Sequence, residues 1–144
     1  MKEIARYSGC FICGDKNEAG IKARFYFKNN KAYTECVAER RFEGYHDVYH
    51  GGLTSALLDE VMIKALLAQG IFAMTVELNV RYHKAIYIGQ RLFFEGRLVE
   101  KRGRIYQTQG QAVNSDKEVV ASAIGKYLSV KEPMKSKLLE SLER

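Results

Sequence analysis

Residues 53–69 have the composition of a helix that is buried on almost every side. The segment is rich in Leu, Ala and Met, follows the pair Gly51-Gly52 and ends at Gly70. Glycine is frequent at the ends of helices and rare within them. A helix that is apolar nearly all round must be covered by other elements, so we expect the rest of the chain to wrap around it. Its charged side chains are Asp59, Glu60 and Lys64.

Strands are predicted on both sides of this helix in the sequence. Residues 73–83 alternate between apolar and polar, which predicts a long, half-buried strand. The apolar side chains of that strand are Met74, Val76, Leu78, Val80 and Tyr82. Residues 21–27 also alternate, and Asn29-Asn30 predicts a tight turn into a second strand at 31–38. Residues 91–128 read as three more strands, with turns at 102–103 and 114–117.

Small residues recur at every second position of the last three strands, which would let the helix approach the sheet closely. These residues are Gly96, Gly110, Ala112, Ala121, Ala123 and Gly125. The predicted fold class is therefore α+β, a long central helix wrapped by a strongly curved antiparallel sheet. We expect residues 1–130 to form a single domain, and residues 131–144 to form a short, exposed, amphipathic helical tail.

The composition restricts the class of protein. The net charge is +6, from 23 basic and 17 acidic residues in a chain of 144, which favours anionic partners such as the phosphates of CoA. No stretch has the ~20 apolar residues that span a membrane, and no signal peptide is expected. Three cysteines are an odd number, typical of reduced thiols, so a cytoplasmic location is predicted.

Asp59 and Glu60 are the candidate chemical groups within the apolar helix. Burying an unpaired carboxylate costs several kcal/mol, so a fold retains one for a reason. Asp59 is predicted to be a general base or a nucleophile. For Glu60 the interpretation favours a place at the edge of the helix or an ion pair with Lys64, four residues later, over a place at the site.

The segment Tyr49-His50-Gly51-Gly52 precedes the helix and could hold a developing oxyanion. Two glycines allow a ligand to approach the free N–H groups at the positive end of the helix dipole. Asp59 lies eight residues after Gly51, so both could border one cleft. The alternative is that the glycines only make the start of the helix flexible.

Two other motifs suggest metal binding only weakly, and no metal site is predicted. His46 and His50 are four residues apart, but in a loop and without further ligands. Cys10-Phe-Ile-Cys13-Gly14 is a single Cys-x-x-Cys, and Cys36 does not supply the second pair that zinc sites usually have. We interpret it as a structural turn.

The basic residues are spread along the chain. Arg97, Lys101, Arg102 and Arg104 flank one hairpin, and Arg81 and Lys84 lie near the end of the strand at 73–83. A solvated basic rim is the simplest interpretation, and a rim that attracts CoA phosphates is the next. RNA binding is disfavoured because aromatic residues are not interleaved with the basic ones.

Three segments resemble the hotdog-fold acyl-CoA thioesterases of the PaaI-like group. They are "EGYHDVYHGGLTSALLDEVM" (43–62), "CFICGDKNEAGIKARF" (10–25) and "TVELNVRYHKAIYIGQ" (75–90). The resemblance extends over residues 10–128 and is specific in the spacing from HGG to Asp59. His46 and Ala85 depart from it, because proline is usual at both positions.

The resemblance implies a homodimer, often assembled into tetramers, with active sites between subunits and no cofactor. The N–H of Gly51 or Gly52 would polarise the thioester carbonyl, Asp59 would act as base or nucleophile, and Thr75 of the partner subunit would assist the water. The further residues expected to bind substrate are His50, Gly52, Glu60, Arg81, Arg102 and Arg104.

The predicted function is a cytoplasmic acyl-CoA thioesterase that hydrolyses the thioester to a free acid and CoA. Three alternatives stay open. The first is a non-catalytic acyl-CoA-binding protein on the same fold. The second is an enoyl-CoA hydratase-like enzyme that uses His50 with Asp59. The third is nucleic-acid binding through the net positive charge.

Overall fold

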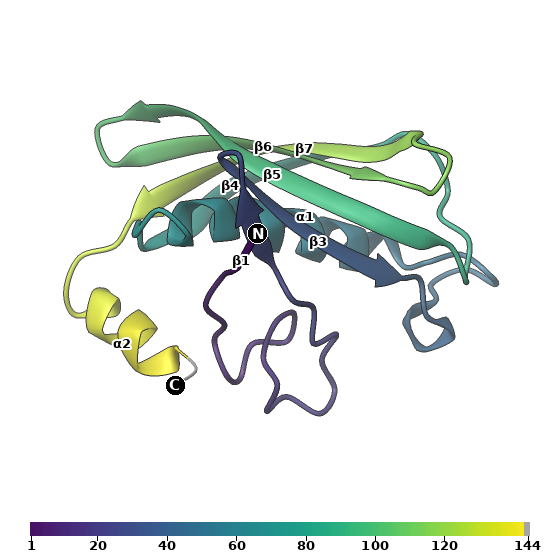
Figure 1. The fold of residues 1–144 in the computed structure, drawn as a ribbon, viewed down its shortest axis with the longest axis horizontal. Helices are drawn as coiled ribbons and strands as arrows, with labels where there is room; N and C mark the ends of the chain where they lie inside the picture. Colours follow the sequence, from purple (N-terminus) through teal and green to yellow (C-terminus); the bar gives the residue numbers. More distant parts are fainter. Residues whose placement is uncertain (143–144) are drawn as a thin grey trace.

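A seven-stranded antiparallel sheet arches over helix α1 (Gly51–Leu67) in the computed structural model, which describes residues 1–142 (Figure 1). Along the sheet the strand order is β1-β2-β3-β5-β6-β7-β4. The predicted α+β class, with a central helix against a curved antiparallel sheet, is confirmed. The strands are β1 (Lys2–Glu3), β2 (Tyr26–Lys28), β3 (Lys31–Val37), β4 (Ala73–Tyr82), β5 (Arg91–Arg102), β6 (Ile105–Val113) and β7 (Val119–Ser129).

Helix α1 begins two residues earlier than the sequence analysis placed it, because His50 caps it. The Gly52 N–H donates to His50 Nδ1 at 2.8 Å, so the side chain of His50 satisfies one of the free N–H groups of the first turn. After the helix, Gly70 has a φ of +77°, which glycine adopts at little cost and which ends the segment as predicted. Eight residues of α1 are buried, Lys64 among them.

The small residues of the sheet let α1 lie directly against it. A Cβ atom at Gly96 would be 2.8 Å from the carbonyl oxygen of Val61, and one at Gly110 would be 3.0 Å from Met62 Cγ. Gly96, Gly110 and Ala123 are neighbours across β5, β6 and β7. The predicted row of small residues is therefore the surface on which α1 packs.

The strand predicted at 21–27 is mostly wrong. Only β2 is a strand in this region, and Lys22 has a φ of +57°, which no regular strand allows. The N–H groups of Ile21 and Ala23 bond instead to the carbonyl oxygens of residues 11 and 12, at 2.9 and 2.8 Å. The alternation in this segment therefore reflects packing against the N-terminal loop. The turn at Asn29-Asn30 is confirmed, with φ values of 52° and 61°.

Strand β4 has nearly the predicted length but lies at the edge of the sheet, and its apolar side chains are not all covered. Met74, Val76 and Tyr82 are 44%, 55% and 55% exposed. A bulge in the pairing with β7 lies between Thr75 and Glu77. Such an extra residue turns the side chains before it to the opposite face. Thr75 therefore faces the helix together with Leu78, which packs against the core, and the expected separation into one apolar and one polar face fails here.

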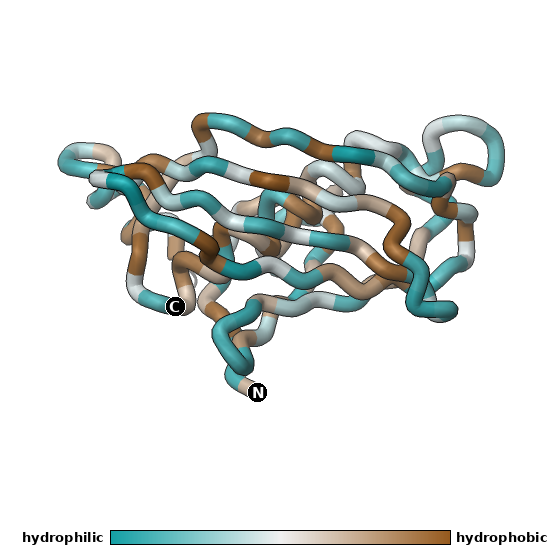
Figure 2. Tube along the Cα trace, turned by 90° about the horizontal axis from the view of Figure 1, so that it is seen from above, coloured by the Kyte–Doolittle hydropathy of each residue, from teal (hydrophilic) through white to brown (hydrophobic). Residues whose placement is uncertain are grey.

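The C-terminal helix α2 (Met134–Ser141) lies beside the N-terminal loop and away from the sheet (Figure 1). None of its residues is buried, as the sequence predicted. Residues 143–144 of the predicted tail lie outside the described residues, and the domain boundary at residue 130 stays a prediction. Seen from above, polar and apolar residues alternate along the strands of the sheet (Figure 2). Within residues 1–142, neither helix has the length and apolar character that crossing a bilayer requires.

Candidate active site

Two hydroxyl groups hold the carboxylate of Asp59. Thr75 Oγ1 lies 2.9 Å from Asp59 Oδ1 and 3.2 Å from Oδ2, and Tyr127 OH lies 2.8 Å from Oδ1. Both hydroxyls donate, because an ionised carboxylate only accepts. Asp59 is half-buried and Thr75 is exposed, so the carboxylate is fixed in position and still reachable from outside.

Thr75 reaches Asp59 within one chain. The resemblance implies that the threonine comes from the partner subunit, whereas here the bulge in β4 turns Thr75 toward α1 of its own chain. An oxygen that donates to the carboxylate keeps its lone pairs free. Thr75 can therefore also accept a hydrogen bond from a water molecule beside Asp59.

Tyr127 is a site residue that the sequence analysis missed. Its hydroxyl also bonds to the backbone carbonyl of Asp59 at 3.2 Å. Burial, and then the negative charge of Asp59, raise the pKa of Tyr127 well above its usual value, so the hydroxyl stays protonated and donates. A Cβ atom at Gly125 would lie 2.6 Å from the ring of Tyr127. The pattern Gly125-x-Tyr127 was the available signal, since the glycine makes room for the ring.

The start of α1 offers one free amide rather than two. The Gly52 N–H is taken by His50 Nδ1, and the Leu53 N–H bonds to the carbonyl of His50 at 3.0 Å. In the part of the chain that the structure describes, no acceptor bonds the N–H of Gly51. Gly51 is thus the candidate oxyanion donor, and the backbone N–H of Gly52 is occupied by the cap.

A cleft of about 950 Å³ opens at this helix start. Tyr82 closes one side, since its hydroxyl donates to the carbonyl of Gly51 at 2.9 Å and also bonds Ser55. Asp59 is not among the lining residues, which include Tyr45, His50, Gly51, Gly52, Tyr82 and Lys84. Eight residues of helix separate Gly51 from Asp59, about 12 Å at ~1.5 Å per residue. Within one protomer, Gly51 and Asp59 therefore do not line this cleft together, and their place at one shared cleft stays a prediction.

Glu60 points away from Asp59, toward the N-terminal loop. Its Oε2 lies 3.9 Å from Lys64 Nζ, so the ion pair favoured by the sequence analysis is confirmed. Burial, and then the charge of Cys10, raise the pKa of Glu60 to about 7. The Cys10 sulfur lies 3.5 Å from Glu60 Oε2 and is a second polar neighbour of this carboxylate. The structure thus places Glu60 in a different environment from the groups around Asp59.

The three arginines expected at the substrate do not form one cluster within the protomer. Arg81 lines a groove of about 580 Å³ on the face of the sheet away from α1, together with Lys31 and Arg97. Arg102 pairs with Glu100 at 2.8 Å, and Arg104 donates to the carbonyl of Ser129 at 2.6 Å. Their contact with substrate stays a prediction.

The sequence matches a family model, the thioesterase superfamily, over residues 46–121, which is more than half of the chain. A protein from Archaeoglobus fulgidus named as an esterase is 28% identical over 105 residues, covering 73% of this chain and 68% of its own.

Solved structures share the fold. One is a thioesterase superfamily protein named RHA08564, with a TM-score of 0.78 and 24% identity over 83% of this chain. This chain spans 62% of the length of that structure. The PaaI protein of Escherichia coli has a TM-score of 0.69 and 18% identity, with 74% and 78% of the two chains covered.

A third similar structure is a thioesterase protein of Streptococcus pneumoniae with coenzyme A, at a TM-score of 0.69 and 16% identity, with 73% and 82% of the chains covered. The same protein has been solved with an aspartate at its position 52 and a threonine at its position 68 each replaced by alanine.

The family match and the shared fold agree with each other and with the sheet-wrapped helix built from the sequence. This chain belongs to the thioesterase superfamily, and its hotdog fold is that of the PaaI-like members.

Proposed function

We propose that this protein is an acyl-CoA thioesterase that hydrolyses its substrate to a free acid and CoA. The observation that carries the proposal is the Asp59 carboxylate, fixed by Thr75 and Tyr127 in the helix that also presents the free N–H of Gly51. The three cysteines are free, which fits the reducing conditions of the cytoplasm, and we place the protein there.

In this mechanism Asp59 acts as the general base. A water molecule that donates one hydrogen bond to Asp59 and another to Thr75 Oγ1 attacks the thioester carbonyl while Asp59 takes its proton. The N–H of Gly51 stabilises the oxyanion that forms on the carbonyl oxygen. When the carbon–sulfur bond breaks, Asp59 returns the proton to the CoA sulfur, and the carboxylic acid is released.

One carbonyl carbon cannot meet both groups of the same chain, because about 12 Å of helix separates Gly51 from Asp59. The donor and the base must therefore come from two subunits. Strand β4 is the natural contact, since it lies at the edge of the sheet and exposes Met74 and Val76. An exposed edge strand of 10 residues leaves a row of backbone groups open to pairing with another chain.

Antiparallel pairing of two β4 strands joins the groups that each chain keeps apart. If the twofold axis passes between Asn79 and the same residue of the partner subunit, the extra residue of the bulge brings Thr75 opposite Tyr82 of the partner subunit, with both side chains on the face that α1 covers. Tyr82 in turn bonds Gly51, so the free amide of one subunit comes beside Asp59 of the other. We therefore propose a homodimer with two shared active sites, which can assemble further into a tetramer.

The comparisons support this proposal. The streptococcal thioesterase contains coenzyme A, and the aspartate and threonine replaced in it are 16 positions apart, as are Asp59 and Thr75. A hydratase that uses His50 with Asp59 is less well supported, because Nδ1 of His50 caps α1 and His50 lies in the cleft that lacks Asp59.

The test is CoA release from a panel of acyl-CoA thioesters by the wild type and Asp59→Asn. Loss of a general base costs about 10²–10⁴-fold in rate, and the variant keeps the shape of the side chain. We expect kcat to fall within that range on the best substrate. Wild-type rates in the variant would remove Asp59 from the mechanism, and tight acyl-CoA binding without turnover by the wild type would instead favour a binding protein.

A further inference from the structure

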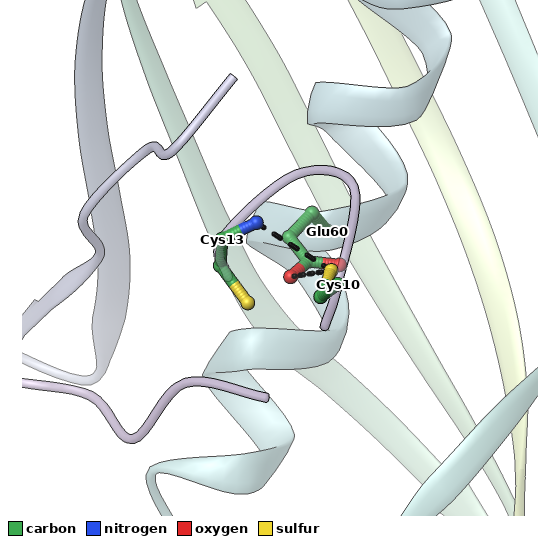
Figure 3. A group of neighbouring side chains, drawn as sticks. All are labelled: Cys10, Cys13 and Glu60. Atoms are coloured by element: carbon green, nitrogen blue, oxygen red, sulfur yellow. Dashed lines mark hydrogen bonds between the residues drawn. The ribbon is translucent and has the colours of Figure 1, made fainter. Parts of the chain in front are cut away.

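The N-terminal loop brings two cysteines against the turn of α1 that carries Glu60 (Figure 3). The sulfur atoms of Cys10 and Cys13 and a carboxylate oxygen of Glu60 all lie within 4.8 Å of one another. Cys13 is buried, whereas Cys10 and Glu60 are half-buried. None of the three takes part in the reaction proposed above, so this cluster needs its own explanation.

The turn that holds the cysteines is rigid and already suited to a thiolate. The N–H groups of Ile12 and Cys13 point at Cys10 Sγ, at 3.3 and 3.5 Å. These two backbone donors stabilise a thiolate at Cys10. At Gly14 a Cβ atom would be 2.3 Å from the carbonyl oxygen of Ser8, so a larger residue would disrupt the turn.

The charges around the cluster suit a divalent cation. Lys64 is buried, with its side chain 1% exposed, and its ammonium donates to the carbonyl of Ala5 while it pairs with Glu60. With a metal bound, two thiolates and one carboxylate would carry three negative charges, and that ammonium would balance one of them. A divalent cation would make the set neutral, which is the condition for charges to remain buried at moderate cost.

We propose that Cys10, Cys13 and Glu60 bind one zinc ion, with a water molecule as the fourth ligand. Thiolates select zinc among the common divalent ions, and zinc accepts carboxylate oxygen in the same tetrahedral set. The ion would tie the N-terminal loop to the turn of α1 next to Asp59. A reversible Cys10–Cys13 disulfide would use the same sulfurs, but it would leave the third donor, Glu60, without a role.

A second cluster of possible ligands, Glu43, His46 and Asp47, does not qualify. All three are exposed, and both carboxylates already pair with Arg40. This second cluster supplies a control. His46→Ala would weaken nonspecific binding of a cation at this surface, whereas changes at the cysteines would not.

The test is a titration of the reduced, metal-free, full-length protein with Co²⁺, followed by Zn²⁺. We expect one Co²⁺ per chain, an absorption band in the near ultraviolet from thiolate-to-cobalt charge transfer, and loss of that band when Zn²⁺ displaces Co²⁺. Cys10→Ser and Cys13→Ser should abolish the band, and Glu60→Gln should weaken Co²⁺ binding by about ten-fold or more. Cys36→Ser and His46→Ala should leave both unchanged.

Several results would overturn the zinc site. One is a wild-type protein that binds Co²⁺ without a charge-transfer band. A second is a band equally strong in Cys10→Ser or Glu60→Gln. A third is a Cys10–Cys13 disulfide forming readily in a protein that binds no metal, which would identify a redox pair instead. The first readout uses only the wild type, so it stands even if a cysteine variant fails to fold.

Discussion

At the scale of single residues, Asp59 owes its position to neighbours that are distant in sequence. Thr75 and Tyr127 each donate to its carboxylate from a different strand of the sheet. An unpaired carboxylate at this depth would be costly, and two hydrogen bonds offset that cost without neutralising the charge. The same arrangement leaves Asp59 able to take a proton from water.

Gly51 offers a direct test of the oxyanion donor, because proline removes its N–H and little else. Proline is favoured at the first position of a helix, and the ψ of 124° at His50 suits the residue before a proline. We expect Gly51→Pro to fold normally and to lower kcat by about 10²–10³-fold. The measurement is CoA release together with the circular dichroism of the helix.

Gly51→Ala is the matched comparison for that variant. It keeps the N–H, and its added Cβ would meet Tyr82 at 3.4 Å, an ordinary contact. Its loss of kcat should therefore be much smaller than that of Gly51→Pro. Equal losses in the two variants would show that the amide proton is not the group that matters.

At the scale of elements, the sheet and the helix fit because three strands lack side-chain bulk where α1 crosses them. Gly96 and Gly110 face Val61 and Met62 of the helix at contact distance. Larger residues would push α1 away from the sheet and carry Asp59 away from Thr75 and Tyr127. The packing of these small residues is thus a condition for the site.

Gly96→Ala should destabilise the protein because its new Cβ would meet backbone atoms, at 2.8 Å from the Val61 carbonyl oxygen. Backbone cannot rotate away, so α1 must shift, and overpacking of this kind costs about 1–3 kcal/mol. Urea denaturation measures the free energy of unfolding of each variant. Gly9→Ala is the control, since no atom of residues 1–142 beyond its two chain neighbours lies within 4 Å of its new Cβ. Equal stability of the two variants would contradict the close packing of α1 against Gly96.

At the scale of the whole molecule, one chain holds all the groups of the proposed site but not in one place. The base lies beside the start of β4, and the free amide lies beside its end, at Tyr82. The edge position of β4 and its exposed apolar residues provide the surface that a second copy would cover. On this proposal, assembly creates the active site as well as burying surface.

Mixing two inactive proteins tests whether the site is shared. In a dimer of one Asp59→Asn subunit and one Gly51→Pro subunit, one site carries both defects and the other carries none. An equal mixture, exchanged to equilibrium, should therefore recover about a quarter of the wild-type activity. A site formed within one chain would recover nothing.

Disrupting the edge of the sheet provides the companion measurement. Val76→Asp places a charge on the exposed edge strand, and we expect it to yield monomers in sedimentation with little CoA release. Val99→Asp, at a similarly exposed position on β5, is the control for the charge itself. A dimeric Val76→Asp protein would argue against pairing through β4.

The sequence alone was enough for the architecture, and it singled out Asp59 as the candidate base, a role that stays a prediction. An apolar helix with two acids after a double glycine, and strands with small residues at every second position, are local patterns of the sequence. Helix and strand geometry translate that periodicity directly into faces. The turn at Asn29-Asn30 and the end of the helix at Gly70 followed from residue type, because Asn and Gly adopt a positive φ at little cost.

Tertiary structure decided where the partners of Asp59 and Glu60 lie. The hydrogen bonds from Thr75 and Tyr127 to Asp59, and the contact of Glu60 with Cys10, join residues that are 16 to 68 positions apart. Strict alternation placed Thr75 on the wrong face, because one extra residue in a strand reverses every side chain beyond it. Local pattern fixes which way an element faces, but the pairing of elements fixes which side chains meet.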